Sequence, residues 1–322
     1  MFFFIAIALF IALVLIKGRL TLHERIYPRL YGGIEFPEDF FPAKNETEYR
    51  KKVLEGFRNI RCTSVVICAI TRNDAEVLPL TIGRIEKLGS LFSDYRVIVF
   101  ENDSIDATPD ILKRWEKANS RVKILSGSLR GSPVAFGTRT EKLAWFRNRY
   151  LDEMRNSAEY ESFNYVIVLD MDLKGGWSYD GVASSFSRLD WDAAASNSIG
   201  YHNLRRTYYD TYALKPESIL TRGLSGKILG NGSQIQRNGS FIEVRSAFGG
   251  LCVYRKDKLL SRKYSGILEG RPVSEHVPLN SDGSMKFILN PSQITLTGTQ
   301  EDKEHPARLP WTRSLRLMFL NW

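Results

Sequence analysis

The chain has 322 residues, of which 43% are hydrophobic and 25% charged, so it can bury the core of one large α/β domain or two small ones. Its net charge of +9 at pH 7 is compatible with nucleic acid, an anionic membrane or a phosphate-bearing substrate as partner. No block of five or six Lys or Arg and no zinc-finger or RNA-binding signature is present. We therefore expect no nucleic acid partner.

The N-terminal stretch MFFFIAIALFIALVLI is apolar throughout and is followed by Lys17 and Arg19. No small-residue cleavage site accompanies it, so residues 1–18 predict an uncleaved transmembrane signal anchor rather than a removed signal peptide. A buried core helix is the alternative. Residues 19–60 mix charge, proline and aromatic residues, and predict a stem followed by a short helix.

Two patterns in the sequence predict opposite orientations for such an anchor. The basic residues near the apolar run all follow it, which by the positive-inside rule would leave the body in the cytosol. Four N-x-S/T sequons, a weak signal, favour a lumenal body instead; they begin at Asn45, Asn102, Asn231 and Asn238. We expect a single-pass membrane protein whose body is lumenal, in the Golgi or endoplasmic reticulum if the source is eukaryotic.

From residue 61 onward, predicted strands and helices alternate. Residues 63–70, 95–102 and 121–126 predict strands, and residues 74–92, 108–119 and 139–156 predict helices. Leu78, Ile82, Ile85 and Phe92 share one face of the first helix, and Thr108 is the expected cap of the second. This order with short connections predicts a parallel sheet with right-handed crossovers.

The stretch YVIVLDMDLKGG, residues 165–176, is a buried strand that runs into two aspartates. Neither face of the strand alternates with polar residues, which is typical of a central strand covered on both sides. Asp170 and Asp172 are at i and i+2, so in an extended chain they point to the same side and can face one cation or polar ligand. The alternative is that two acids merely open a loop.

Two more polar clusters follow predicted strands, TRND at 71–74 and ENDSIDAT at 101–108. In parallel α/β sheets the ligand crevice lies at the carboxyl ends of the strands, so these clusters and DMD are expected on one rim. Glu101 and Asp103 suit hydrogen bonds to a base or ribose, and Arg72 suits a phosphate. No G-x-G-x-x-G follows the first strand and no P-loop is present, so a divalent cation on Asp170 and Asp172 is expected to neutralise the phosphates.

Together these features resemble a GT-A glycosyltransferase. More narrowly, RIEKLGSLFSDYRVIVFENDSIDAT, RTEKLAWFRN, VIVLDMD, YYDTYAL, FGGLCVYR and SEHVPLN resemble the fungal capsule-associated α-1,3-mannosyltransferase family and its bacterial and viral relatives, over roughly residues 62–295. The resemblance implies an α/β fold with a GT-A, Rossmann-like, mixed and mostly parallel sheet flanked by helices. Residues 61–176 would form the donor half and residues 177–322 the acceptor half.

The resemblance also implies partners and a reaction. The enzyme would be a hexosyltransferase that moves a hexose, such as mannose, from GDP-mannose or a UDP-sugar to a glycan or other hydroxyl acceptor, with Mn²⁺ or Mg²⁺. Relatives often carry a third acid soon after the DxD, whereas this chain continues as LKGG. In the metal site, Asp172 would bind the ion directly, Asp170 would contact the ribose or the ion, and His276 would be a third ligand.

Other residues are assigned by the same resemblance. Arg139 and Arg147 would line the donor pocket, with a solvated helix face as the alternative. Gly249 and Gly250 would approach the acceptor or the transferring sugar, with a plain β-turn as the alternative. Glu275 would be the base of an inverting reaction, and Asp210 would be more relevant if configuration is retained.

Two other functions compete with this reading. An aspartyl phosphatase also begins with DxD after a buried strand, but it requires Thr or Val where this chain has Lys174. A catalytically inactive, membrane-anchored protein of the same fold would have lost its acids, whereas this chain keeps all three polar clusters.

Overall fold

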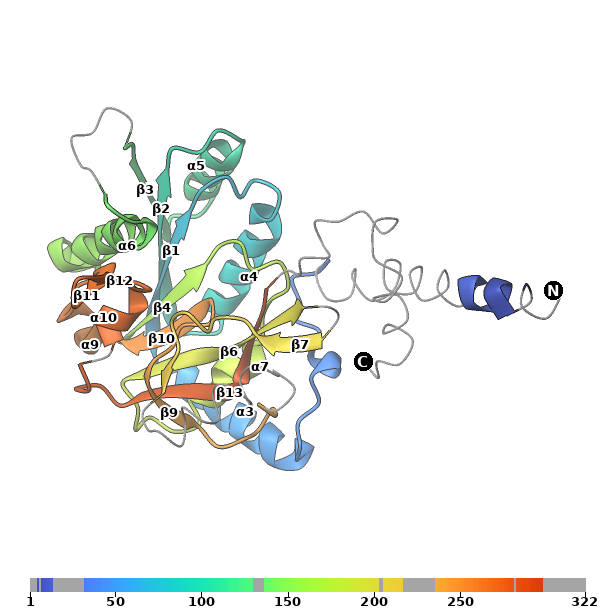
Figure 1. Cartoon of the computed structure of the whole chain (residues 1–322). Coiled ribbons are helices and arrows are strands. Elements are labelled where there is room, and N and C mark those ends of the chain that lie inside the picture. Colours follow the sequence, from blue (N-terminus) through green and yellow to red (C-terminus); the bar gives the residue numbers. More distant parts are fainter. Residues whose placement is uncertain are drawn as a thin grey trace.

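A computed structural model describes residues 5, 7–13, 32–129, 136–202, 205–216, 235–280 and 282–297 (Figure 1). Its strands are β1 Ser64–Thr71, β2 Asp94–Asn102, β3 Val122–Gly127, β4 Tyr165–Asp170, β5 Gly176–Trp177, β6 Ala193–His202, β7 Arg205–Tyr208, β8 Lys215–Pro216, β9 Ile242–Ser246, β10 Leu251–Arg255, β11 Ile267–Leu268, β12 Arg271–Pro272 and β13 Phe287–Leu296. Its helices are α3 Glu46–Ile60, α4 Leu78–Ser90, α5 Thr108–Ala118, α6 Arg139–Asn156, α7 Tyr179–Ser185, α9 Lys256–Leu260 and α10 His276–Asn280, with 3-10 turns η2 Glu38–Phe40 and η3 Ala158–Tyr160.

One large sheet organises the domain, in the order β3-β2-β1-β4-β10-β6-β13-β9-β8. The first four strands in this order are mutually parallel. Strand β10 runs antiparallel between β4 and β6, and β13 is parallel to β6. The predicted mixed, mostly parallel sheet flanked by helices is therefore confirmed.

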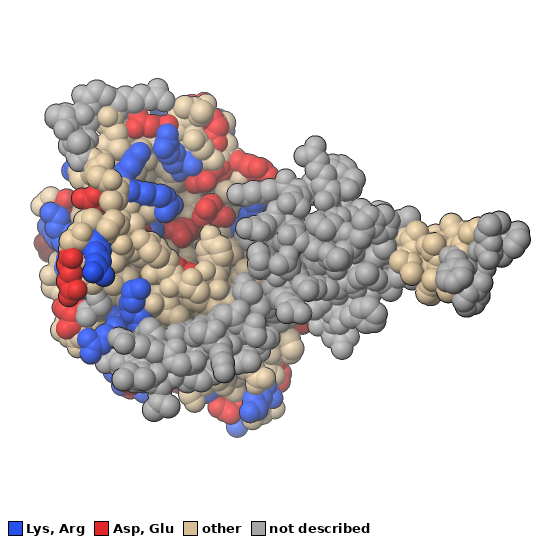
Figure 2. Space-filling view, viewed as in Figure 1, with Lys and Arg blue, Asp and Glu red and all other residues tan. Residues whose placement is uncertain are grey.

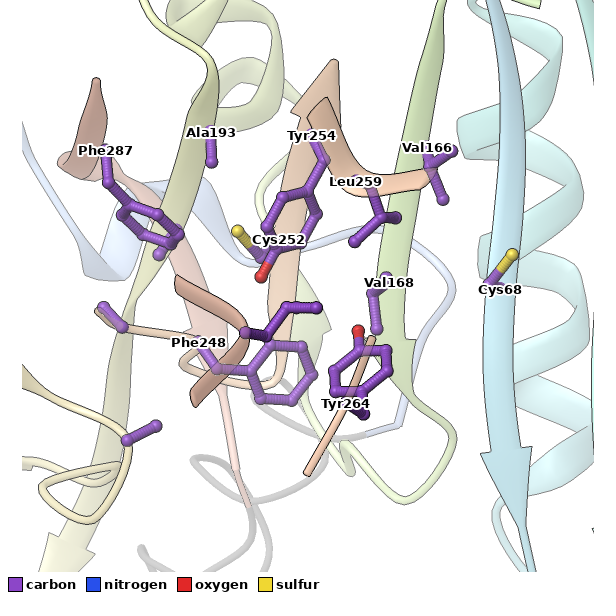
Figure 3. Packing of buried hydrophobic residues seen from close by; sticks show 14 of the residues in the cluster. Cys68, Val166, Val168, Ala193, Phe248, Cys252, Tyr254, Leu259, Tyr264 and Phe287 are labelled. Carbon is purple, nitrogen blue, oxygen red and sulfur yellow. The ribbon is translucent and has the colours of Figure 1, made fainter. Parts of the chain in front are cut away.

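Each face of the sheet is covered by its own set of helices (Figure 1). Alternate residues of a strand point to opposite faces. In β1, Val65 and Ile67 therefore pack with α3, α4, α5 and α7, while Val66 and Cys68 pack with α6 and α9. Figure 3 shows part of the cluster on the α6 and α9 side, which includes Val168, Phe248, Cys252 and Tyr264. Two apolar layers thus fix the central strands, and with them the position of the strand ends.

Helix α6 has the bounds that the sequence predicts, residues 139–156. Thr138 caps its N-terminus by accepting a hydrogen bond from the backbone N–H of Glu141, at 3.2 Å, and its hydroxyl donates to the Glu141 carboxylate. In α5 the cap differs from the prediction, because Ala107 is the N-cap and Thr108 is the first helical residue. The Thr108 hydroxyl instead accepts a hydrogen bond of 2.9 Å from the backbone N–H of Asp74, in the neighbouring loop.

The segment predicted as a stem, residues 19–60, is described from residue 32 onward and packs on the domain. Phe36, Phe40 and Phe41 are buried in a cluster with residues of β6 and β13. Helix α3 crosses α7 so closely that a Cβ on Gly56 would lie 1.7 Å from the carbonyl oxygen of Ala183. The part of this segment that is described belongs to the folded body.

In the described part of the chain, no helix has both the length and the apolar composition needed to cross a bilayer. Of the predicted anchor, residues 1–4, 6 and 14–18 lie outside the described residues. The predicted orientation is not tested by the fold. One of the four sequons, at Asn102, falls on a side chain that is almost fully buried at the end of β2.

Candidate active site

The polar clusters predicted to share a rim do meet at one edge of the sheet. The register places Glu101 of β2 beside Thr71 of β1, and Ile70 of β1 beside Asp170 of β4. Their parallel direction puts the three carboxyl ends together, as expected for a crevice in an α/β sheet. Figure 2 shows acidic side chains gathered in a hollow of the molecule, with basic side chains close by.

Asp170 and Asp172 differ in their surroundings. Asp172 is exposed, and no hydrogen bond to its side chain is found among the described residues. Asp170 is the last residue of β4, and its backbone N–H donates to the carbonyl of Gly250 at 2.9 Å. Burial raises the pKa of Asp170 to about 7, the neighbouring charge of Asp172 adds to this rise, and Arg147 opposes it. The pair thus combines one anchored carboxylate with one that faces solvent.

Arg147 lies in the interior and not on a solvated helix face. Its side chain is only 4% exposed and projects from α6. Nε donates to Oε1 of Glu275 at 2.8 Å, and Nη2 donates to Oδ1 of Asp170 at 2.9 Å. The guanidinium also lies 5.0 Å from the ring centre of Phe248. Arg147 therefore connects the end of β4 with the residue that precedes α10.

Glu275, the predicted base, is held in this network. Its side chain is 6% exposed, and burial alone would raise its pKa. The neighbouring His276, whose Nε2 lies 3.5 Å from Oε1, and then the charge and hydrogen bond of Arg147 outweigh that effect, so the pKa of Glu275 lies below its ordinary value. The carboxylate is thus ionised and paired, and in this arrangement its contact with Arg147 orients that side chain.

His276, the predicted third metal ligand, is enclosed by aromatic rings. Its ring stacks on Phe248 at 3.8 Å and meets Tyr264 edge-on at 5.5 Å. Burial lowers the pKa of His276 to about 3, which keeps the imidazole neutral. Neither ring nitrogen has a hydrogen-bond partner among the described residues. Over the same residues, no group of three or more His, Cys, Asp or Glu side chains is placed to hold a metal ion, so His276 is not brought together with the DxD pair.

Asp210, the other catalytic candidate, follows β7 and is joined to the predicted glycine pair. Its Oδ2 accepts a hydrogen bond of 2.9 Å from the backbone N–H of Gly249, and its Oδ1 accepts one of 3.2 Å from Ala213. Burial raises the pKa of Asp210, and the two backbone donors partly offset the rise. Asp210 is thereby engaged in holding two loops together.

Gly249 and Gly250 both have positive φ, +67° and +77°. A Cβ on Gly249 would lie 2.4 Å from the carbonyl oxygen of Ser196, and one on Gly250 would lie 2.8 Å from Leu173. The turn itself therefore requires both glycines. Their predicted contact with an acceptor is not needed to explain them.

The remaining predicted residues lie on the rim formed by β1, β2 and the start of α6. Arg72 and Arg139 are exposed. Glu101 accepts a hydrogen bond of 2.9 Å from the backbone N–H of Ser104. Asp103 accepts one of 2.9 Å from Leu129 and another of 2.6 Å from Ser128. The two acids expected to contact a base or ribose therefore also shape the loops of the rim.

Two residues near the pair were not singled out from the sequence. Asp74 accepts hydrogen bonds from the Thr71 hydroxyl at 2.6 Å and from the backbone N–H of Arg72 at 3.2 Å. Burial raises its pKa, with a further rise from the charge of Asp172. Tyr209 is exposed and lies within range of the charges of Asp172 and Asp170. Both belong to strings already noted, TRND and YYDTYAL, and only the folded chain places them beside the DxD pair.

No family model matches the sequence and no curated protein does, but a search of solved structures finds similar folds. TarS of S. aureus is 12% identical with a TM-score of 0.42, over 74% of this chain and 61% of that one. GalNAc-T7, solved with UDP, GalNAc and Mn²⁺, is 14% identical with a TM-score of 0.44, over 81% and 48%. The mannosyltransferase PcManGT from Pyrobaculum calidifontis, in complex with GDP-Man and Mn²⁺, is 12% identical with a TM-score of 0.43, over 78% and 65%.

This chain therefore spans roughly half to two thirds of the length of these three solved chains, since the aligned shares are 61%, 48% and 65%. The identities and TM-scores are too low to carry conclusions about substrates. Function is accordingly inferred from the residues of the site.

Proposed function

We propose that the protein is a metal-dependent glycosyltransferase that moves a hexose from a nucleoside diphosphate sugar to a hydroxyl acceptor. The observation that carries this proposal is the pair of acids at the carboxyl end of β4, in which Asp172 faces solvent and Asp170 is fixed by Arg147. The resemblance of the sequence strings to capsule-associated mannosyltransferases supports it. Mannose is the proposed sugar, and GDP-mannose the proposed donor.

The residues at this edge fit a hard divalent cation. Carboxylate oxygens are the ligands that Mg²⁺ and Mn²⁺ prefer, and Mg²⁺ is commonly held by one or two carboxylates together with substrate phosphates. A cation bound by Asp170 and Asp172 would relieve the repulsion between their negative charges, which contributes to the raised pKa of Asp170. Asp172 and Asp170 would hold the ion, which when bound would neutralise negative charge on the leaving diphosphate.

The protein's own residues would then position the donor. Arg147 keeps the Asp170 carboxylate in one orientation, and Glu275 keeps Arg147 in place. The exposed guanidinium groups of Arg72 and Arg139 are free to approach phosphate oxygens from the rim. The loops that follow β1 and β2 are joined by a 3.0 Å hydrogen bond from the backbone N–H of Asn73 to Ser104, which gives a nucleoside a rigid edge to bind.

In the transfer, the acceptor oxygen bonds to the anomeric carbon, the bond from that carbon to the diphosphate oxygen breaks, and the acceptor proton passes to a base. Glu275 and Asp210 remain the proposed carboxylates for this step. Both are engaged in hydrogen bonds here, Glu275 with Arg147 and Asp210 with Gly249. Either would have to exchange that contact for the substrate before acting as base or nucleophile.

The proposal includes attachment to a membrane through residues 1–18 with a lumenal body. The support is the apolar sequence of that segment. Retention of the full-length chain in the membrane fraction after an alkaline carbonate wash would agree with it, whereas release into the supernatant would contradict it. Protection of the body from protease in sealed microsomes tests the orientation.

The function is tested by donor hydrolysis with the full-length protein and a panel of GDP- and UDP-sugars, with and without Mn²⁺. We expect release of the nucleoside diphosphate from one donor, loss of release after chelation, and recovery on adding Mn²⁺. A protein that releases phosphate from phosphomonoesters but no nucleoside diphosphate would instead be a phosphatase. A protein that binds a nucleotide sugar without turnover would be an inactive relative of this fold.

A further inference from the structure

Two exposed tyrosines follow β7, which pairs with β6 on the side of β4 away from β1 and β2. Tyr209 is 62% exposed and Tyr212 is 54% exposed. Apart from Phe10 near the N-terminus, they are the aromatic side chains that count as exposed in the described part of the chain. Exposed aromatic rings on an otherwise folded loop often mark a binding surface.

The backbone that carries these rings is fixed. The backbone N–H of Tyr209 donates to the carbonyl of Ser198 at 2.9 Å, in β6. Asp210, between the two tyrosines, accepts from Gly249 and Ala213. The Tyr209 ring also lies over Gly200, where a Cβ would come within 3.3 Å of its Cδ2 atom. The backbone that carries the rings is therefore already ordered, so ligand binding loses little entropy by ordering it.

The same contacts connect the loop that carries the rings to the end of β4. Asp210 is bonded to Gly249, and the carbonyl of the next residue, Gly250, accepts the backbone N–H of Asp170 at 2.9 Å. The loop that carries Tyr209 and Tyr212 is therefore joined, through Gly249 and Gly250, to the end of the strand that carries the proposed metal ligands.

The position in the sheet separates this surface from the proposed nucleoside side. The sheet order is β2-β1-β4-β10-β6, with β7 paired to β6, so β4 and its acids lie between the rim loops and the tyrosines (Figure 1). A donor whose nucleoside lies at β1 and β2 and whose diphosphate lies at the acids would leave the region beyond β4 to the acceptor.

We propose that Tyr209 and Tyr212 form a stacking surface for a hexopyranose ring of a glycan acceptor. The apolar face of such a ring can lie against an aromatic face, while its hydroxyls meet the phenol groups and nearby carboxylates. This inference rests on the proposed function, and it names the class of acceptor for the same site.

The test uses the full-length protein and the methyl α-glycosides of mannose, glucose and galactose as probes. Binding is measured by saturation-transfer NMR, and activity by acceptor-stimulated release of nucleoside diphosphate. Variants are Tyr209→Leu, Tyr212→Leu and Tyr209→Phe. The matched control is Leu189→Ala, which alters an exposed apolar side chain that precedes the amino end of β6, at the opposite edge of the sheet.

We expect at least one glycoside to bind the wild type. Each Leu variant should raise its KM about three- to tenfold, and should change the acceptor KM more than the donor KM. Tyr209→Phe should keep most of the affinity because the ring is retained, and Leu189→Ala should behave as the wild type. Unchanged glycoside binding in both Leu variants, or no glycoside binding by the wild type, would overturn the inference.

Two further outcomes are distinguishable. A rise in the donor KM in the Leu variants, with the glycoside KM unchanged, would overturn the inference by assigning the rings to the donor sugar. Failure of the wild type to release any nucleoside diphosphate would refute the proposed function instead, and tyrosine-dependent glycoside binding would then still identify a carbohydrate surface.

Discussion

Arg147 of α6 and Asp170 of β4 are joined by a hydrogen bond of 2.9 Å between Nη2 of the arginine and Oδ1 of the aspartate. The same guanidinium donates from Nε to Glu275 at 2.8 Å. One buried cation thus holds two acids that are far apart in the sequence. The orientation of Asp170, the first aspartate of the DxD, is therefore set by Arg147, a residue that is almost fully buried.

This relationship predicts different effects for two substitutions of Arg147. Arg147→Met leaves Asp170 and Glu275 without their cation, and should cost about 3–5 kcal/mol of stability. Arg147→Lys keeps the positive charge, but its ammonium group lacks the planar guanidinium that contacts both acids. This variant should therefore fold, while its rate of donor hydrolysis falls at least tenfold, mainly in kcat. Thermal unfolding and steady-state kinetics measure the two effects.

Arg149→Lys is the matched control, because Arg149 is exposed on the same helix and lies 3.8 Å from the ring centre of Trp145. It should leave turnover unchanged. Wild-type turnover in Arg147→Lys would show that Arg147 acts only in stability.

His276 offers a second prediction, because its surroundings favour packing over metal binding. His276→Ala removes a ring enclosed by Phe248 and Tyr264 and should cost about 3 kcal/mol of stability. His276→Phe restores a ring without nitrogen atoms. It should fold, with the Mn²⁺ concentration for half-maximal activity unchanged. A clear rise of that concentration in His276→Phe would restore His276 as a metal ligand.

The glycine turn before β10 gives a third prediction. Gly249→Ala places a Cβ 2.4 Å from the Ser196 carbonyl at φ +67°, so both strain and clash oppose it. Gly270→Ala has a similar φ of +73° with nothing within 4 Å, so only strain applies. Backbone strain alone should lower the free energy of unfolding by about 1 kcal/mol, and Gly249→Ala should lower it by more than that. The free energy of unfolding of both variants is measured by chemical denaturation. Equal losses in the two variants would show that β6 moves aside without an energetic cost.

Much of the fold could be predicted from local patterns. The bounds of α6 agree with the predicted helix at residues 139–156, and β4 follows from an unbroken apolar run. The shared rim follows from the parallel order of β1, β2 and β4. These features depend on residues close in sequence or on general rules of sheet connection.

The site could be predicted only in part, because its chemistry depends on contacts between distant segments. The sequence identified Asp170 and Asp172, but it could not show that Arg147 turns inward or that Glu275, 128 residues away, is its partner. It also could not show that aromatic rings enclose His276. Tyr209 was not singled out within the string YYDTYAL, because its exposure is known only from the folded chain.

Asp172 is the residue on which the proposed function depends most. It is exposed, so Asp172→Asn should leave the melting temperature unchanged. The substitution removes one negative charge while preserving the shape of the side chain. Asp110→Asn, an exposed acid on α5, is the matched control and should alter neither stability nor activity.

The most direct measurement is donor hydrolysis as a function of Mn²⁺ concentration, for the wild type, Asp172→Asn and Asp110→Asn. We predict that Asp172→Asn loses about 3–4 kcal/mol of transition-state stabilisation, a fall of roughly 10²- to 10³-fold in rate, and that its response to Mn²⁺ is weakened. Near-normal turnover of Asp172→Asn with an unchanged Mn²⁺ titration would contradict the account, and would show that the two aspartates are only the polar end of a buried strand.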